Sequence, residues 1–148
     1  MKGGIVVVGD EIIFQPAGVF LPATLHHIIS KNDIVRSNPL GVESSTQTFV
    51  VEEDLKNAIK NSPSCQYTTP LYTVAGQGYW RYAAWTEKAS HLRLNGKPVL
   101  KNIKGITKGS VTFVVTKPAT NSVPSPDPQS THFCKFLIRP VSTKVHID

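Results

Sequence analysis

Cysteine is scarce in this chain, and the scarcity argues against a fold stapled by disulfides. Only Cys65 and Cys134 occur among 148 residues, far apart in the sequence, whereas small disulfide scaffolds carry several cysteines at short spacings. We therefore expect reduced thiols, or at most metal ligands. A chain of this length can bury a core without cross-links, and we expect a single domain over 1–148.

Long hydrophobic runs are also absent. The run from Ile5 to Val8 is too short for the core of a signal peptide, and Asp10 and Glu11 follow at once. No other segment approaches the roughly 20 apolar residues that a bilayer-spanning helix needs. These absences predict synthesis in the cytoplasm.

Charge is sparse and lacks clustered arginine. Charged residues make up 18% of the chain and the net charge is +6. The densest basic run holds lysines only, at Lys97, Lys101, Lys104 and Lys108. Either these lysines are solvated side chains that protect neighbouring strands from edge pairing, or they face an acidic partner or a nucleic acid.

Motifs of the common enzyme classes are missing. The sequence has no Gly-x-Ser-x-Gly elbow, no Walker-type loop and no His-Glu-x-x-His. The fragment Gly76-Gln-Gly78 leads into a strand-like sequence rather than a helix, so it does not indicate a nucleotide site. No pair of carboxylates suggests acid–base chemistry. We therefore expect a protein that is not an enzyme.

Short apolar runs separated by turn residues are what the chain does contain. Eleven prolines and ten glycines punctuate them, which is typical of a mainly β domain, small and compact or conical, with short strands and tight turns. Gly76-Gln-Gly78 is expected to interrupt the strand pattern between two of these strands. The expected strands are 5–8, 12–14, 19–25 with a possible continuation to 29, 46–51, 67–74, 79–85, 110–116 and 133–138.

One short helix is predicted around 51–61. Leu55, Ala58 and Ile59 would share one face, and three acidic residues load the first turn, where the helix dipole favours negative charge. Pro63 follows the expected end of the helix.

Two turn regions stand out. The dipeptide Asn95-Gly96, followed by Lys97 and Pro98, lies between two apolar runs, and both of its residues accept the positive φ of a type I′ hairpin turn. The segment 121–129 contains three prolines among Ser and Asp residues, so we expect a stiff, exposed loop.

Histidine and cysteine offer candidate metal ligands. His132 and Cys134 are two residues apart, so on a strand they would project from the same face. A histidine from another strand could complete a tetrahedral zinc or iron site. The other interpretation is hydrogen-bonded histidines and cysteines that act as small core residues. The candidate ligands are His26 or His27, which would point to opposite faces, Cys65, His132 and Cys134.

An aromatic cluster supports an alternative function. Tyr79, Trp80, Tyr82 and Trp85, with Arg81 between them, could stack on bases in a small β-barrel module that binds an oligonucleotide or a glycan. Consecutive residues of a strand face opposite sides, however, which splits the cluster, and packing within a sheet is the competing interpretation.

Four segments in order resemble one known family. They are "GDEIIFQP" at 9–16, "PSCQYTTPLYTVAGQGYW" at 63–80, "LNGKPVL" at 94–100 and "KGSVTFVVTKPAT" at 108–120. Together they resemble the PAAR-like spike-tip proteins of contractile injection systems, machines related to phage tails and type VI secretion. The resemblance covers roughly residues 5–120, and the segment around 43–62 that carries the predicted helix is not part of the pattern.

The resemblance implies a mechanical function. Such a protein caps a trimeric spike protein (VgrG-like), assists puncture of the target envelope with transient contact to the membrane, and can attach effector cargo. It would be assembled into the injection particle and delivered outside the cell or into the target on firing, with no nucleic-acid partner. In this family, histidines and cysteines hold a metal near the tip of a small pointed β domain, which again points to zinc or iron.

Overall fold

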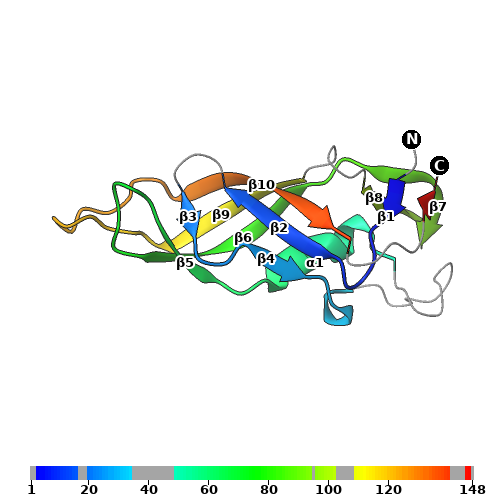
Figure 1. The fold of residues 1–148 in the computed structure, drawn as a ribbon, viewed down its shortest axis with the longest axis horizontal. Helices are drawn as coiled ribbons and strands as arrows, with labels where there is room; N and C mark the ends of the chain where they lie inside the picture. The colour runs from blue at the N-terminus through cyan, green and yellow to red at the C-terminus, as the bar shows by residue number, and fades with distance from the viewer. Residues whose placement is uncertain are drawn as a thin grey trace.

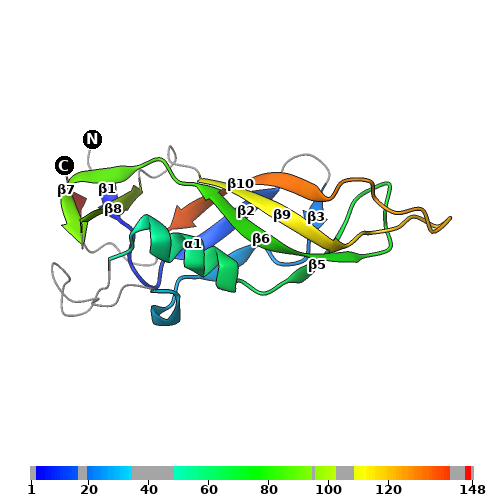
Figure 2. The ribbon, with the colours of Figure 1, turned by 180° about the vertical axis from the view of Figure 1, so that it is seen from behind.

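The computed structural model describes residues 3–16, 20–34, 49–94, 96–102, 109–140 and 146–147. The molecule is elongated, and both chain termini lie at one end (Figure 1). It narrows toward the opposite end, where the loops 69–75 and 118–130 extend beyond the strands (Figures 1 and 2). We call this the narrow end and the opposite one the wide end. No helix among the described residues is long and apolar enough to cross a membrane.

Two antiparallel sheets, one α-helix and one short 3-10 helix make up the described fold, which confirms the predicted mainly β class. The larger sheet has the order β3-β5-β6-β9-β10-β2-β4, and the smaller one the order β11-β1-β8-β7. The strands of the larger sheet are β2 (Glu11–Pro16), β3 (Leu21–Pro22), β4 (His26–Ile28), β5 (Cys65–Thr68), β6 (Gly76–Ala84), β9 (Gly109–Lys117) and β10 (Thr131–Arg139). The smaller sheet contains β1 (Gly3–Ile5), β7 (Lys88–Leu94), β8 (Lys97–Asn102) and β11 (His146–Ile147).

Aromatic side chains fill the inner face of the larger sheet. Strand β10 shows the cause, because its residues alternate between buried and more exposed positions as the two-residue period of a strand requires. Phe14 stacks on Trp80 with ring centroids 4.2 Å apart, and Phe113 meets the same indole edge-on at 5.0 Å. All three rings are at least 98% buried. Such rings contribute large buried areas together with favourable ring geometry.

Helix α1 (Glu52–Asn61) confirms the predicted helix and packs against β6. Leu55, Ala58 and Ile59 are fully buried, as their spacing predicts. The backbone N–H of the residue before the helix donates to the carboxylate of Asp54 at 3.2 Å and so caps the first turn. At the other end the hydroxyl of Ser62 donates to the carbonyl of Ile59, in the last turn, at 2.6 Å.

The β7–β8 hairpin is also confirmed. Leu94 pairs with Lys97, which leaves a two-residue loop, and Gly96 has φ +78°. A positive φ at this position is what a type I′ turn requires. The first residue of the loop, Asn95, lies outside the described residues.

Two predictions about the segment 67–79 were wrong. The predicted strand 67–74 ends with β5 at Thr68, and the chain then turns, with backbone hydrogen bonds in both directions between Thr69 and Tyr72. Pro70 within that turn cannot donate to a ladder. The predicted glycine break at 76–78 is instead the start of the long strand β6.

Close approach of β9 explains why glycine occupies β6. A Cβ atom at Gly76 would lie 2.3 Å from the carbonyl oxygen of Lys117, and one at Gly78 would lie 2.3 Å from the ring of Phe113. The two glycines therefore allow the backbones and the aromatic core to meet, and they do not end the strand.

Other expected strands differ mainly in length. Of the predicted strand 19–25, only β3 at 21–22 forms, and its place at the edge of the sheet accommodates Pro22. The possible continuation to 29 is a separate strand, β4. In the expected strand 46–51, the described part forms isolated bridges at Phe49 and Val51. The remainder of that strand, at 46–48, lies outside the described residues.

Substitution of Gly76 tests the close approach. We expect Gly76→Ala to lower the free energy of unfolding by about 2–3 kcal/mol, because the new methyl group meets backbone atoms that cannot rotate away. Chemical denaturation measures the loss. Gly4→Ala is the matched control, since its Cβ would meet nothing nearer than 3.9 Å. Equal effects of the two substitutions would contradict the explanation.

Candidate functional site

The narrow end is built from two loops that are joined by backbone hydrogen bonds. Val74 and Thr120 donate to one another's carbonyl groups, each at 2.9 Å, and so connect the 69–75 loop to the 118–130 loop. Within the longer loop, the N–H of Asp127 donates to the carbonyl of Ala119 at 2.7 Å. The predicted proline-rich loop 121–129 is therefore held in a defined conformation.

A buried polar cluster fastens this loop to the sheet. The hydroxyl of Tyr67, on β5, donates to Asp127 Oδ2 at 2.9 Å and accepts the N–H of Ala119 at 3.0 Å. His132 Nε2, on β10, lies 3.0 Å from the same carboxylate oxygen. The ring of Phe20 stacks on the imidazole with centroids 4.5 Å apart. The contacts thus join β5 and β10 to the loop through a single carboxylate.

The electrostatics of this cluster favour an ionised Asp127. Burial raises the pKa of its carboxyl, but hydrogen bonds from the N–H of Gln129 and from Tyr67 and His132 outweigh burial and hold the pKa below the ordinary value. Burial is also the main reason that the pKa of Tyr67 is raised. The three side chains are more than 90% buried, so a substrate has no access to them and the cluster acts as a tether.

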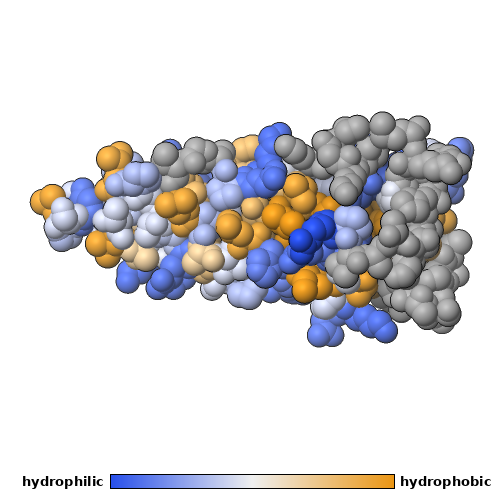
Figure 3. Space-filling model, viewed as in Figure 1, coloured by the Kyte–Doolittle hydropathy of each residue, from blue (hydrophilic) through white to orange (hydrophobic). Residues whose placement is uncertain are grey.

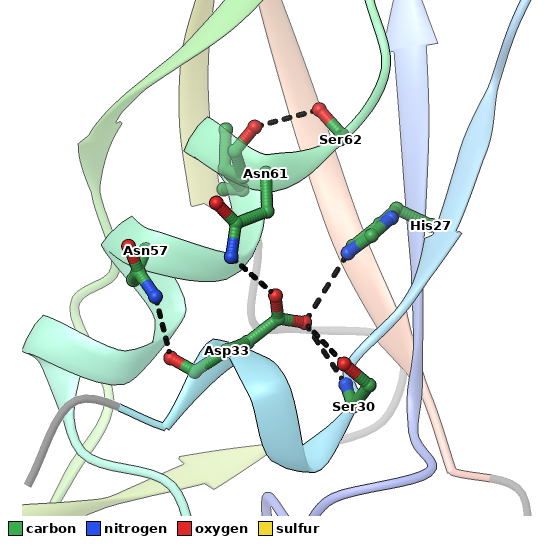
Figure 4. Close-up of polar contacts among 7 residues, drawn as sticks. His27, Ser30, Asp33, Asn57, Asn61 and Ser62 are labelled. Atoms are coloured by element: carbon green, nitrogen blue, oxygen red, sulfur yellow. Dashed lines mark hydrogen bonds and ion pairs between the residues drawn. The ribbon is translucent and has the colours of Figure 1, made fainter.

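A second carboxylate, Asp33, ties together β4, the short 3-10 helix η1 (Lys31–Asp33) and α1 (Figure 4). Asp33 Oδ2 accepts the N–H of Ser30 at 2.9 Å and lies 3.3 Å from His27 Nε2. Asp33 Oδ1 accepts a hydrogen bond from the amide of Asn61 at 2.8 Å, and the Asp33 carbonyl accepts one from Asn57 at 2.9 Å. The loop after β4 is thereby attached to the helix.

The pKa of Asp33 reflects the same contacts. Burial raises the pKa of this carboxyl. Hydrogen bonds from Ser30, Asn61 and His27 outweigh burial and place the pKa below the ordinary value. The carboxylate therefore stabilises the fold in its ionised form.

An open groove of about 570 Å³ separates α1 from the β7–β8 hairpin. Four of its five charged side chains form two ion pairs: Lys88 lies 3.0 Å from Glu52, and Lys97 lies 2.5 Å from Glu53. The hydroxyl of Tyr82 donates to Glu52 at 2.6 Å, and burial together with this bond raises the tyrosine pKa. The groove is thus crossed by ion pairs that connect the helix to the smaller sheet.

The predicted metal ligands are dispersed. His27 pairs with Asp33 and His132 with Asp127, while the exposed His26 lies 3.3 Å from Glu11. Cys65 and Cys134, on β5 and β10, are buried and are not joined by a disulfide. In the part of the chain that the structure describes, no group of three or more His, Cys, Asp or Glu side chains could hold a metal ion. The presence of zinc or iron stays a prediction, which elemental analysis of the purified protein tests.

The aromatic cluster is mainly a packing feature. Trp80 and Trp85 are both 99% buried, and Trp85 donates its indole N–H to the carbonyl of Lys101 at 2.9 Å. Tyr82 is engaged by Glu52, and Tyr79 alone of the four rings is exposed, at 40%. Four rings that face different sides do not make a platform for bases.

Sequence reasoning missed the two carboxylates that organise these contacts. Asp127 carries the one charged side chain in the segment 118–130 and stands between two prolines. A single charge in an otherwise uncharged, proline-rich loop was the available signal. Asp33 gave no comparable signal, because Asn57 and Asn61 reach it from a distant helix.

Asp33 gives a pH-dependent test. Its pKa is lowered by folding, so its contribution is complete above the ordinary pKa of about 4 and is lost as the pH falls through the folded-state value. At pH 7 we expect Asp33→Asn to lower the free energy of unfolding by about 1–3 kcal/mol. Denaturation at several pH values should show this difference shrinking below about pH 4. A difference that stays constant into acid would show that the carboxylate charge is not involved.

Removal of the Tyr67 hydroxyl tests the tether of the narrow end. Tyr67→Phe leaves the N–H of Ala119 and the carboxylate of Asp127 without this partner, which should cost about 1–3 kcal/mol. Hydrogen exchange in peptides from 118–130 should accelerate more than in peptides from β6. Tyr79→Phe is the control, because that ring is partly exposed. Unchanged exchange in 118–130 would argue against the tether.

Comparison with known proteins supplies the identity of the fold. A search of curated protein sequences found no match. A model of the family described as contractile injection system spike tip protein matches residues 1–138. The match spans both sheets through β10, including the tethered narrow end and the helix that the sequence pattern had left outside the resemblance. The chain therefore belongs to the family of contractile injection system spike tip proteins.

Proposed function

We propose that this protein is the non-catalytic apex of the central spike, seated on a trimeric spike protein of the VgrG-like type. The observation that carries the proposal is the family match over residues 1–138. The tapered shape supports it, because a cap on a spike must be narrower at its leading end (Figure 1). We place the wide end on the spike and the narrow end in front.

The arrangement of strands suits a part that transmits force. The three nine-residue strands β6, β9 and β10 lie side by side and run roughly along the long axis (Figure 2). A push at the wide end therefore travels along covalent backbone, while lateral hydrogen bonds and the aromatic core resist splaying. Sheath contraction would supply the push, and the apex would concentrate it on the target envelope.

The wide end offers features that a seat requires. In the smaller sheet, β7 pairs with β8 on one side and is an edge strand in the described order. An exposed edge presents unpaired backbone groups to which another chain can bind. The ion pairs across the open groove hold this sheet to α1, so the seat and the core would move together.

Several further roles follow from this placement. The apex would contact the target membrane transiently and could provide an attachment point for effector cargo. The protein would be made in the cytoplasm, assembled into a particle of the type VI or phage-tail-like kind, and delivered outside the cell or into the target. No nucleic-acid partner is expected, since Trp80 and Trp85 are in the core.

Electron microscopy of assembled particles tests the proposal. We expect particles from cells that make the protein to show density at the spike apex, and particles from a deletion strain to end bluntly at the spike. Expression of the wild-type chain in the deletion strain should restore the density. Density for this chain at the baseplate or sheath, or an unchanged apex after deletion, would overturn the placement.

A further inference from the structure

The narrow end carries the two most exposed large hydrophobic side chains of the described residues, and a third that is more than half exposed. Leu71 is 77% exposed, Val123 is 75% exposed and Val74 is 54% exposed. Leu71 and Val74 belong to the 69–75 loop and Val123 to the 118–130 loop, both of which extend beyond the strands. Hydrophobic side chains are visible at this end in Figure 3. Because Val74 and Thr120 are joined by backbone hydrogen bonds, the two loops form one surface.

Val123 lies at the apex of a closed turn. The N–H of Asn121 donates to the carbonyl of Ser125 at 3.1 Å. The side-chain oxygen of Asn121 accepts the N–H groups of Val123 and Ser125, at 3.0 and 2.9 Å. The side chain of Val123 is therefore presented outward by a turn that the backbone and side chain of Asn121 hold closed.

Exposed charge is absent from both loops. The segments 69–75 and 118–130 contain a single Asp, Glu, Lys, Arg or His residue, Asp127. Its carboxylate is buried and bonded to Tyr67 and His132. Transfer of a charged side chain into hydrocarbon is costly. This end of the molecule can therefore leave water without that cost.

Backbone donors are satisfied internally as well. Pro124, Pro126 and Pro128 have no N–H group. Every other backbone N–H in 119–129, apart from that of Ser122, donates within the protein. Internal satisfaction of backbone groups is the condition for protein to enter the apolar part of a bilayer.

We propose that Leu71, Val74 and Val123 form an apolar point that inserts into the interfacial region of a lipid bilayer. The partner is lipid and not protein, because this end is convex and narrow and most backbone donors of its longer loop are occupied. Protein interfaces instead rely on broad patches with hydrogen bonds and aromatic or arginine anchors. The assignment of the narrow end as the leading end rests on the proposed function. Insertion by the isolated chain does not.

Insertion into a lipid monolayer is the direct test. The full-length protein is injected beneath a phosphatidylcholine monolayer, at an initial pressure above the one at which the protein adsorbs to a bare surface. Neutral lipid and high salt remove attraction that the net charge of +6 would otherwise supply. We expect a rise in surface pressure that is at least about twofold smaller for the variant Leu71→Ser/Val74→Ser/Val123→Ser.

A matched variant separates position from hydrophobicity. Leu25→Ser/Ile28→Ser removes side chains that are 41% and 55% exposed and lie at β4, away from the narrow end. It should insert like the wild type, and circular dichroism confirms that each variant is folded. Equal insertion by the triple variant, or no insertion by the wild type, would overturn the proposal. The triple variant is also tested for assembly into the particle. Normal insertion together with failure to assemble would place the narrow end on the spike and refute its leading role.

A labelled variant provides a second measurement that does not depend on the stability of the triple variant. Both native cysteines are buried, so an environment-sensitive dye should react selectively with Val123→Cys. We expect a blue shift with phosphatidylcholine vesicles and quenching by brominated acyl chains. The same dye on Ile28→Cys should show neither, and equal quenching at the two positions would contradict insertion by the narrow end.

Discussion

The contact between Phe14 and Trp80 is the constraint on which the shape of this protein depends. Strands β2 and β6 are three places apart in the sheet order, so their backbones would be about 14 Å apart in a flat sheet. Their rings nevertheless stack at 4.2 Å. The sheet must curl to allow this contact, and the curled sheet encloses the aromatic core that stiffens the whole molecule.

Polar contacts hold the parts that the core cannot reach. The carboxylates of Asp33 and Asp127 each accept a hydrogen bond from a backbone N–H and lie within hydrogen-bond distance of a histidine nitrogen. They hold different segments of the chain. One attaches the turn after β4 to α1, and the other attaches a proline-rich loop to β5 and β10. An ionised carboxylate in a buried site is tolerated only with several donors, so each of these loops is restricted to the conformation that supplies them.

The narrow end follows a different physical rule from the rest of the surface. Elsewhere, as at Lys88 and Lys97, charged side chains are paired across a groove that water can enter. In the loops 69–75 and 118–130 the single carboxylate is withdrawn into the protein, and proline or internal bonding removes most free donors. A surface without exposed charge is consistent with a part that leads into an envelope.

Local patterns in the sequence by themselves determined the helix at Glu52–Asn61, the two-residue β7–β8 loop and the mainly β class. They did so because capping, turn chemistry and strand periodicity act between residues that are close in the chain. The ordered segments also pointed correctly to a spike tip protein. Only the tertiary structure decided that Gly76 and Gly78 lie within a strand, and that His27 and His132 each face an aspartate. The strand at Gly76 depends on Lys117, which folding brings near from far along the chain. Each histidine lies within six residues of its aspartate, but the carboxylates are also held by Asn61 and Tyr67, which come from distant elements.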